Sequence, residues 1–86
     1  MSQADEIREY ANKHYIEPAR AEGRREVTIR AGDVHNRMGL VDDMPAVCSA
    51  IGSLIFRKKY HVRLINREGP TNGANVFFTF SIESIV

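Results

Sequence analysis

The chain has 86 residues, of which 43% are hydrophobic and 27% are charged, and this composition is typical of one small globular domain. No apolar run approaches the roughly 18 residues that a membrane span needs. The start "MSQADEIREY" is polar and acidic, and the single cysteine, Cys48, has no partner for an internal disulfide. These features exclude a membrane span, a signal peptide and a disulfide scaffold, and they predict a single domain over residues 1–86 in the reducing cytoplasm.

The formal net charge of +1 hides an uneven distribution along the chain. Residues 1–26 carry five Lys or Arg against six Asp or Glu, and residues 27–43 carry two against three. Residues 44–67 carry five bases and no acid, whereas residues 68–86 carry two acids and no base. A block of positive charge on a near-neutral chain predicts a surface that faces a polyanion. The alternative is a set of bases that only keeps a small hydrophobic domain in solution.

The first segment of the chain has the apolar spacing of an amphipathic helix. Ser2 and Asp5 give a loose capping signal, and the pattern predicts a helix from about residue 3 to residue 16. Pro18 lacks a backbone N–H, so we expect a break or a kink there. The helix is expected to resume over residues 19–22 and to end at the glycine that follows.

The middle of the chain predicts one strand and two short helices. The alternation in "EVTIR" predicts a half-buried strand, and "AGDVHNRMGL" predicts a helix that ends at its second glycine. Asp42 or Asp43 is placed to cap the next helix, with Pro45 near its first position. "PAVCSAIGSLIF" then predicts a third helix over residues 45–56, unless Gly52 ends it and "SLIFRKKY" forms a separate turn.

The C-terminal part of the chain predicts a β-hairpin. "HVRLINR" and "NVFFTFSI" alternate between inward and outward residues, and "EGPTNGAN" between them has the Gly, Pro and Asn content of a turn. The residues expected to point inward are Val62, Leu64, Val76, Phe78, Phe80 and Ile82. Ile65 and Phe77 are expected to point outward, which makes the hairpin apolar on both faces.

This order of elements resembles the winged helix-turn-helix domain. "VTIRAGDVHNRMGL" resembles its strand and second helix, "MPAVCSAI" the start of its recognition helix, and "EGPTNGANVFF" its wing. The same stretches resemble a small group of uncharacterised prokaryotic winged-helix-like proteins, which implies a prokaryotic origin and no particular activity. The resemblance covers nearly the whole chain. It implies a small α+β fold with three helices, a short strand and a C-terminal β-hairpin.

The resemblance implies binding of double-stranded DNA, with the third helix in the major groove and the wing at a minor groove or along the backbone. Ser49 and Ser53 can hydrogen-bond a base or a phosphate, and Ala46 can touch a thymine methyl group. Residues 45–56 contain no Arg, Asn or Gln, so strong discrimination between bases is not expected. The expected DNA-contacting residues are Ala46, Ser49, Ser53, Arg57, Lys58, Lys59, Arg63, Arg67, Asn72 and Asn75, with Arg30 and Arg37 as additional phosphate contacts.

A second hypothesis is a protein-interaction or dimerisation module with this fold and no nucleic-acid binding. An apolar outer face of the hairpin needs a cover, supplied by the first helix or by a second copy in a homodimer. The residues expected at such an interface are Tyr10, Tyr15, Ile65 and Phe77. The terminal Ile85 and Val86 add to the apolar residues expected to point outward.

An enzyme is the least favoured class. Asp33 and His35 are two residues apart, so a helix would place them on different faces, and no nucleophile–base pair or phosphate-binding loop is present. The single cysteine and the three histidines lack the spacing of metal ligands. We therefore expect no catalytic residue, no metal, no cofactor and no small-molecule substrate.

Overall fold

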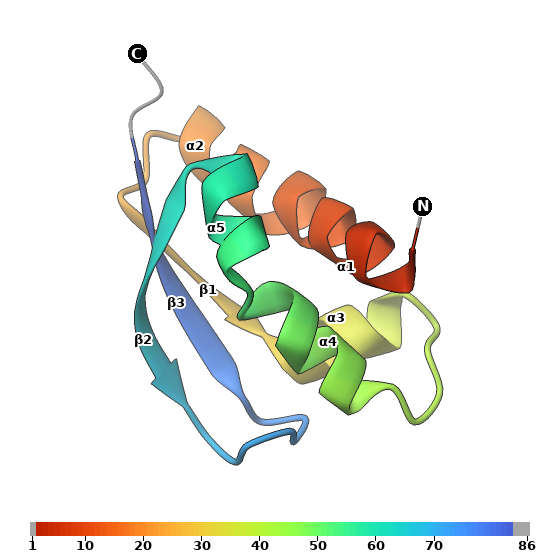
Figure 1. Ribbon diagram of the computed structural model, residues 1–86. Coiled ribbons are helices and arrows are strands. Elements are labelled where there is room, and N and C mark those ends of the chain that lie inside the picture. Colours follow the sequence, from red (N-terminus) through yellow and green to blue (C-terminus); the bar gives the residue numbers. More distant parts are fainter. Residues whose placement is uncertain (1, 84–86) are drawn as a thin grey trace.

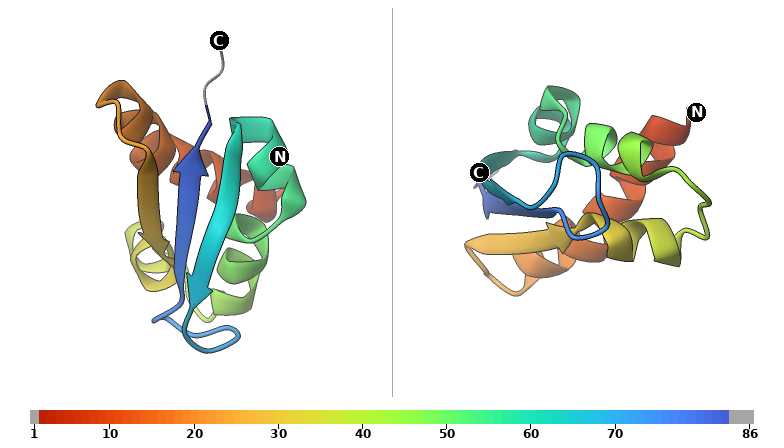
Figure 2. Two further views of the ribbon diagram at one scale, coloured as in Figure 1. Left: turned by 90° about the vertical axis from the view of Figure 1, so that its left-hand side faces the viewer. Right: turned by 90° about the horizontal axis from the view of Figure 1, so that it is seen from below.

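The computed structural model describes residues 2–83, which form helices packed on one three-stranded antiparallel sheet (Figure 1). The mixed α+β class is therefore confirmed. In chain order the elements are α1 (Gln3–Ala11), the π-helical turn η1 (Asn12–Ile16), α2 (Glu17–Ala21), β1 (Glu26–Arg30), α3 (Ala31–Arg37), α4 (Met44–Ile51), α5 (Leu54–Tyr60), β2 (Val62–Glu68) and β3 (Phe77–Ile82). The sheet lies in front of the helices in the left view of Figure 2. No helix in this part of the chain is both long and apolar enough to cross a membrane.

One continuous helical segment runs from α1 through η1 to α2. Its capping box is confirmed, because Ser2 Oγ accepts a hydrogen bond from Asp5 N–H at 3.2 Å and the Asp5 carboxylate accepts one from Ser2 N–H at 3.4 Å. The segment does not break at Pro18, which lies in the first turn of α2. The wide turn η1 comes just before it, and such a turn lets a helix continue past an interrupted hydrogen bond. Gly23, with φ +72°, follows the end of the segment as expected.

Asp5→Asn is expected to lower the midpoint of thermal unfolding at pH 7 and to leave it nearly unchanged near pH 2. The Arg8 guanidinium, 2.6 Å from the Asp5 carboxylate, and then Ser2 hold the pKa of Asp5 below its ordinary value of 3.8. A carboxyl group whose pKa is lowered in the folded state stabilises the fold above its ordinary pKa and loses that contribution as the pH falls. Thermal melts followed by circular dichroism from pH 2 to 7 test this, and a difference independent of pH would contradict it.

The prediction of three helices is wrong, because residues 2–83 form four when α1, η1 and α2 are taken as one. The helix predicted over residues 45–56 is two helices, α4 and α5, which meet at Gly52 and Ser53. Ser53 is the N-cap of α5, since its hydroxyl accepts from Phe56 N–H at 3.2 Å and donates to the carbonyl of Ala50 at 2.7 Å. The chain therefore changes direction at this point, and "SLIFRKKY" continues as a helix instead of a turn.

The connection before α4 is fixed by side chains of two other helices. Asp43 occupies the N-cap position, but its side chain makes no capping hydrogen bond, so the predicted capping by aspartate is wrong. The backbone N–H of Asp43 instead donates to His35 Nε2 at 3.1 Å, and the Asp43 carboxylate accepts from Gln3 Nε2 at 3.1 Å. His35 of α3 and Gln3 of α1 thus set where α4 begins.

The sheet has the strand order β1-β3-β2, with both neighbours of β3 antiparallel to it. β1 and α3 are confirmed as predicted, and in β1 Val27 and Ile29 are buried. A β-bulge between Leu64 and Asn66 shifts the register of β2 by one residue, so that Arg67 stands opposite the inward-facing Phe78. On the open face β3 presents Phe77, Thr79 and Ser81 beside polar or charged partners, which are Glu26, Thr28, Arg30, Arg63, Asn66 and Glu68. The prediction of a hairpin that is apolar on both faces is therefore wrong.

Three phenylalanines form the centre of the core between the sheet and the helices. Phe56, Phe78 and Phe80 are each 0% exposed. The ring of Phe56 on α5 meets the ring of Phe80 on β3 edge to face, with centroids 5.3 Å apart. These contacts hold α5 against the sheet and so place its outer face beside β2.

Candidate nucleic-acid interface

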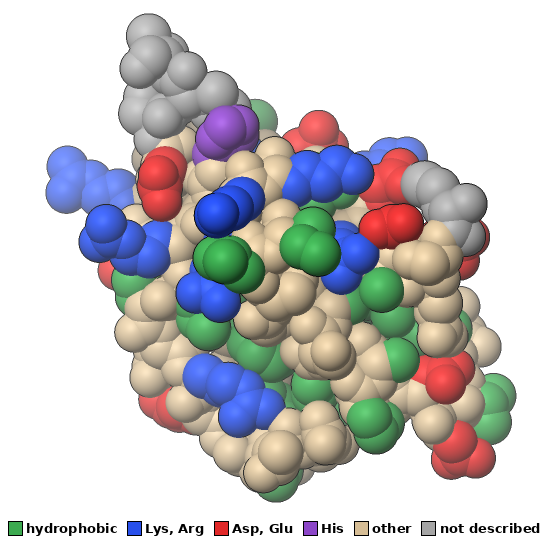
Figure 3. Space-filling view, in the orientation of Figure 1, with side chains coloured by type: hydrophobic (Ala, Val, Ile, Leu, Met, Phe, Trp, Pro, Cys, Tyr) green, Lys and Arg blue, Asp and Glu red, His purple; other side chains and the backbone are tan. Residues whose placement is uncertain are grey.

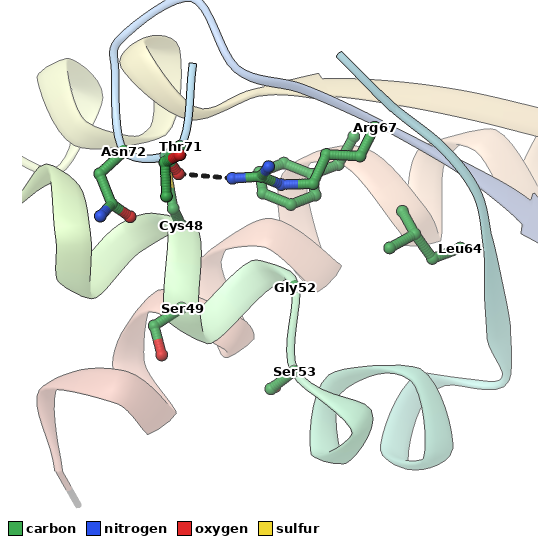
Figure 4. A pocket seen from close by; sticks show the side chains of 9 residues that line it. Cys48, Ser49, Gly52, Ser53, Leu64, Arg67, Thr71 and Asn72 are labelled. Carbon is green, nitrogen blue, oxygen red and sulfur yellow. Dashed lines mark hydrogen bonds between the residues drawn. The ribbon is translucent and has the colours of Figure 1, made fainter. Parts of the chain in front are cut away.

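An open cleft of about 510 Å³ separates α4 from the turn between β2 and β3 (Figure 4). We call it the α4–turn cleft, and it is lined by Cys48, Ser49, Gly52, Ser53, Leu64, Arg67, Thr71, Asn72 and Phe78. Four of the predicted DNA-contacting residues, Ser49, Ser53, Arg67 and Asn72, therefore meet at one place. The residues come from segments that are distant in the chain, so only the fold brings them together.

Arg67 is the charged group of the α4–turn cleft. Its Nη2 donates a hydrogen bond to the carbonyl of Thr71, and its guanidinium lies over the ring of Phe78, 5.3 Å from the centroid. The side chain remains exposed. The bulge in β2 is the cause of this position, because regular alternation would turn Arg67 to the open face of the sheet. Arg67 therefore brings a positive charge to the cleft that Ser49 and Asn72 also line.

A second hollow of about 290 Å³ lies between α5 and the start of β2. We call it the α5–β2 groove, and it is lined by Leu54, Arg57, Lys58, His61, Val62, Arg63 and Glu83. Lys58 and Arg63 are exposed. The side chain of Arg57 instead makes hydrogen bonds within the chain, with Nε donating to the carbonyl of Ser53 at 3.4 Å and Nη2 to that of Gly52 at 3.5 Å. Figure 3 shows Lys and Arg side chains over α5 and along β2, with most acidic side chains at the rim of that view.

The remaining predicted DNA contacts are less available or lie elsewhere. Ser53 already uses its hydroxyl as a helix cap, and Ala46 is half-buried against the core. Arg30 donates to Asn75 Oδ1 at 2.7 Å and pairs with Asp33 at 2.9 Å. This pair of contacts ties the β2–β3 turn to the start of α3, on the side of the turn away from α4. Arg30 and Asn75 therefore position the turn, which is a structural role that the sequence did not indicate.

Arg37 and Lys59 complete the predicted set. Arg37 is exposed at the end of α3, near enough to Tyr15 to oppose the rise in the pKa of that phenol caused by burial. Lys59 lies over the ring of Tyr60, with Nζ 5.5 Å from the centroid. Lys59 thus lies on the same helix as Arg57 and Lys58. Arg37 lies apart from them, on the side of the molecule formed by α1 and α3.

The four residues predicted at a protein interface do not form one surface. Tyr10 and Tyr15 are half-buried and pack against the core on the helical side of the sheet. Ile65 in the bulge is 45% exposed, and Phe77 on the open face is 38% exposed. The first helix therefore does not cover Phe77, because the two lie on opposite faces of the sheet. Ile85 and Val86 lie outside the described residues.

Two exposed hydrophobic residues were missed by the sequence prediction. Leu54 is 55% exposed and Ile55 is 59% exposed on the first turn of α5, although helical spacing had placed both with the buried residues of α4. The reason is the change of direction at Gly52 and Ser53, which separates their face from that of Ile51. The available signal for a new helix start was Ser53, a capping residue directly before the apolar run 54–56.

Cys48 is 5% exposed in the wall of the α4–turn cleft, and burial raises the pKa of its thiol, with Arg67 acting in the opposite direction. Only the thiolate reacts, so modification of folded Cys48 by Ellman's reagent should be about 10-fold or more slower than in urea. The rate should still be increasing at pH 9, because the pKa lies above the ordinary value of 9.0. A rate that reaches a plateau below pH 8 would contradict this assignment.

Within residues 2–83, no group of three or more His, Cys, Asp or Glu side chains is arranged to hold a metal ion. Comparisons of the chain with protein-family models, with curated proteins and with solved structures found no match. Function must therefore be inferred from the residues and their arrangement. The most distinctive arrangement is the α4–turn cleft and the α5–β2 groove, whose linings contain four of the five bases of residues 44–67.

Proposed function

We propose that this chain is a winged-helix protein that binds double-stranded DNA through one surface, the basic face. The basic face is defined by Ser49, Arg57, Lys58, Lys59, Arg63, Arg67 and Asn72. One observation carries the proposal: the five bases of the acid-free segment 44–67 all lie on α5 and β2, with Arg57, Lys58 and Arg63 in the α5–β2 groove and Arg67 in the α4–turn cleft together with Ser49 and Asn72. The proposal requires no metal, cofactor or small-molecule substrate.

The order of the elements supports the winged-helix assignment. A helix, a strand and the helices α3 and α4 come in the expected order, and the hairpin that follows has its second strand paired with the first strand of the chain. The helix α5, between α4 and the hairpin, is an addition to that order. In this assignment α4 is the element presented to the major groove, and the β2–β3 turn is the wing. The α4–turn cleft then lies between the two parts that would contact the duplex.

The side chains on the basic face favour recognition of the DNA backbone over recognition of bases. α4 presents Ser49 as its exposed polar side chain, and it has no Arg, Asn or Gln that could make a bidentate contact to a base edge. Lys and Arg contact phosphates independently of sequence, and each neutralised phosphate adds about −0.9 to the slope of log affinity against log salt. Five such contacts give a slope of roughly −4 to −5 and predict binding that tolerates changes of sequence.

A protein-interaction module without nucleic-acid binding is the second candidate function. The exposed Leu54 and Ile55 favour it, because a solvated helix turn would normally carry polar residues at both positions. DNA binding predicts an affinity for duplex DNA that falls steeply with salt, whereas a protein-interaction module predicts no binding of duplex DNA at any salt concentration.

Fluorescence anisotropy of a labelled 25-base-pair duplex of random sequence tests the proposed function. We expect a Kd in the micromolar range at 50 mM salt and a loss of roughly 100-fold to 1,000-fold in affinity at 200 mM salt, as five phosphate contacts require. No change in anisotropy at protein concentrations near 100 µM in low salt would overturn the proposal. The second candidate function would then be the one to pursue.

A further inference from the structure

We propose that copies of this chain associate head to tail, with the start of α5 of one copy inserted into a hollow beside α1 of the next. The inserted surface, which we call the α5 knob, consists of Leu54, Ile55 and the neighbouring Lys58 and Lys59. The receiving surface, which we call the α1 hollow, is lined by Glu6, Glu9, Tyr10, Asn12, Lys13, His14, Glu17 and Met38. This inference does not rest on DNA binding, because it is carried by Leu54, Ile55 and the α1 hollow, although Lys58 and Lys59 belong to both surfaces.

The α5 knob is an apolar projection with a basic rim. Leu54 and Ile55 are each more than half exposed and are adjacent in the chain, so they form one apolar patch. Lys58 lies one turn beyond Leu54 on the helix, and Lys59 lies one turn beyond Ile55. Both lysines are exposed. A partner that covers the patch must therefore offer apolar surface surrounded by negative charge.

The α1 hollow offers that combination. It has a volume of about 530 Å³, within the range of about 300–1,000 Å³ typical of binding pockets. Glu6, Glu9 and Glu17 at its edge outnumber the single base, Lys13. Its apolar part is formed by Met38 and by Tyr10, whose ring packs on that of His14 with centroids 4.1 Å apart.

The two surfaces share no residue and belong to different elements, so a contact between them is heterologous. Each copy that uses its α5 knob leaves its own α1 hollow free, and association of this kind continues into a chain or closes into a ring. The charges are complementary, with lysines on the knob and glutamates around the hollow, which favours a second copy as the occupant. Lys58 and Lys59 also belong to the basic face, so duplex DNA and a second copy compete for α5.

Sedimentation velocity of the whole chain without DNA tests the proposal. At increasing concentration up to the millimolar range, the mean mass should increase from 9.7 kDa past that of two copies. The knob variant Leu54→Ser/Ile55→Ser and the hollow variant Glu9→Lys should each remain monomeric. In an equimolar mixture, the intact knob of the hollow variant should bind the intact hollow of the knob variant. Association should then end at two copies, because the other knob and the other hollow of each pair are disrupted.

The controls are Val41→Ser and Glu22→Lys, which make the same kinds of change at exposed positions outside both surfaces, and both should associate as the wild-type chain does. The proposal is overturned if the wild-type chain remains monomeric at millimolar concentration. It is also overturned if association stops at a dimer, or if the mixture of knob and hollow variants shows no pairing. Weak duplex binding in the anisotropy experiment would leave these outcomes unchanged, so the two proposals fail separately.

Discussion

Replacing Phe80 by alanine is expected to lower the free energy of unfolding by about 3–5 kcal/mol. Phe80 is 0% exposed, and its ring contacts Phe56 on α5 and stacks near Phe78 on the same strand. Truncation removes apolar contacts and leaves a cavity that a small core cannot fill. A domain of this length has a total stability of roughly 4–13 kcal/mol, so the loss is about a quarter or more of the total and should lower the urea midpoint clearly. Urea unfolding followed by circular dichroism measures the change.

The matched control is Phe77→Ala, which makes the same substitution three residues earlier in the same strand. Phe77 lies on the open face of the sheet and is 38% exposed, so its loss should cost less than about 1 kcal/mol. A similar loss of stability in both variants would contradict the assignment of the two faces of β3.

Reversing two charges on the basic face with Lys58→Glu/Arg63→Glu is expected to weaken duplex binding by about 100-fold to 1,000-fold at low salt. Both side chains are exposed in the α5–β2 groove, so the double variant should fold normally. It removes two attractive charges near phosphates and adds two repulsive ones. The slope of log affinity against log salt should become shallower by about 2, because two phosphate contacts are lost. Anisotropy titrations at several salt concentrations measure both effects.

The control for net charge is Lys13→Glu/Arg24→Glu, which changes the charge of the chain by the same amount outside the basic face. Lys13 is exposed on η1, and Arg24 is exposed in the connection between α2 and β1. Binding by this variant should fall by less than about 10-fold, since distant exposed charges are screened within about 10 Å at 0.1 M salt. An equal loss of affinity in both double variants would mean that total charge, and not the basic face, controls binding.

Local patterns in the sequence predicted most of the elements because those elements are set by local chemistry. The 3.6-residue spacing of α1 and α3 and the two-residue alternation of β1 and β3 follow from which face each element buries. Ser2 and Gly23 marked the two ends of the first helical segment through capping chemistry that requires no knowledge of the fold.

The end of α4 at Gly52 was predicted only as an alternative, and the start of a second helix there was not predicted, because apolar spacing continues across the division. Val47, Ile51 and Leu54 have the spacing of one helical face, yet only the first two are buried. The turn at Gly52 is decided by tertiary contacts, since Phe56 must reach the rings of the sheet for α5 to pack. Leu54 and Ile55 are exposed as a consequence, and the α5 knob could not be foreseen from spacing.

The place of Arg67 in the candidate site also depends on the partner strand. Alternation places Arg67 on the open face, and only the bulge after Leu64 brings it over Phe78 and into the α4–turn cleft. A bulge is a mismatch between two strands, so neither strand alone contains the information. The basic composition of residues 44–67 was visible in the sequence, but the meeting of Arg67 with Ser49 and Asn72 in one cleft required the structure.

The measurement that tests the central claim most directly is an NMR titration of the nitrogen-15-labelled chain with a short random-sequence duplex. The largest changes in amide chemical shift should occur at Ser49, Lys58, Arg67 and Asn72, with little change at Thr28 on the open face of the sheet. That result would assign DNA binding to the basic face. Absence of any shift with excess duplex at low salt, or shifts confined to the open face or to α1, would contradict it.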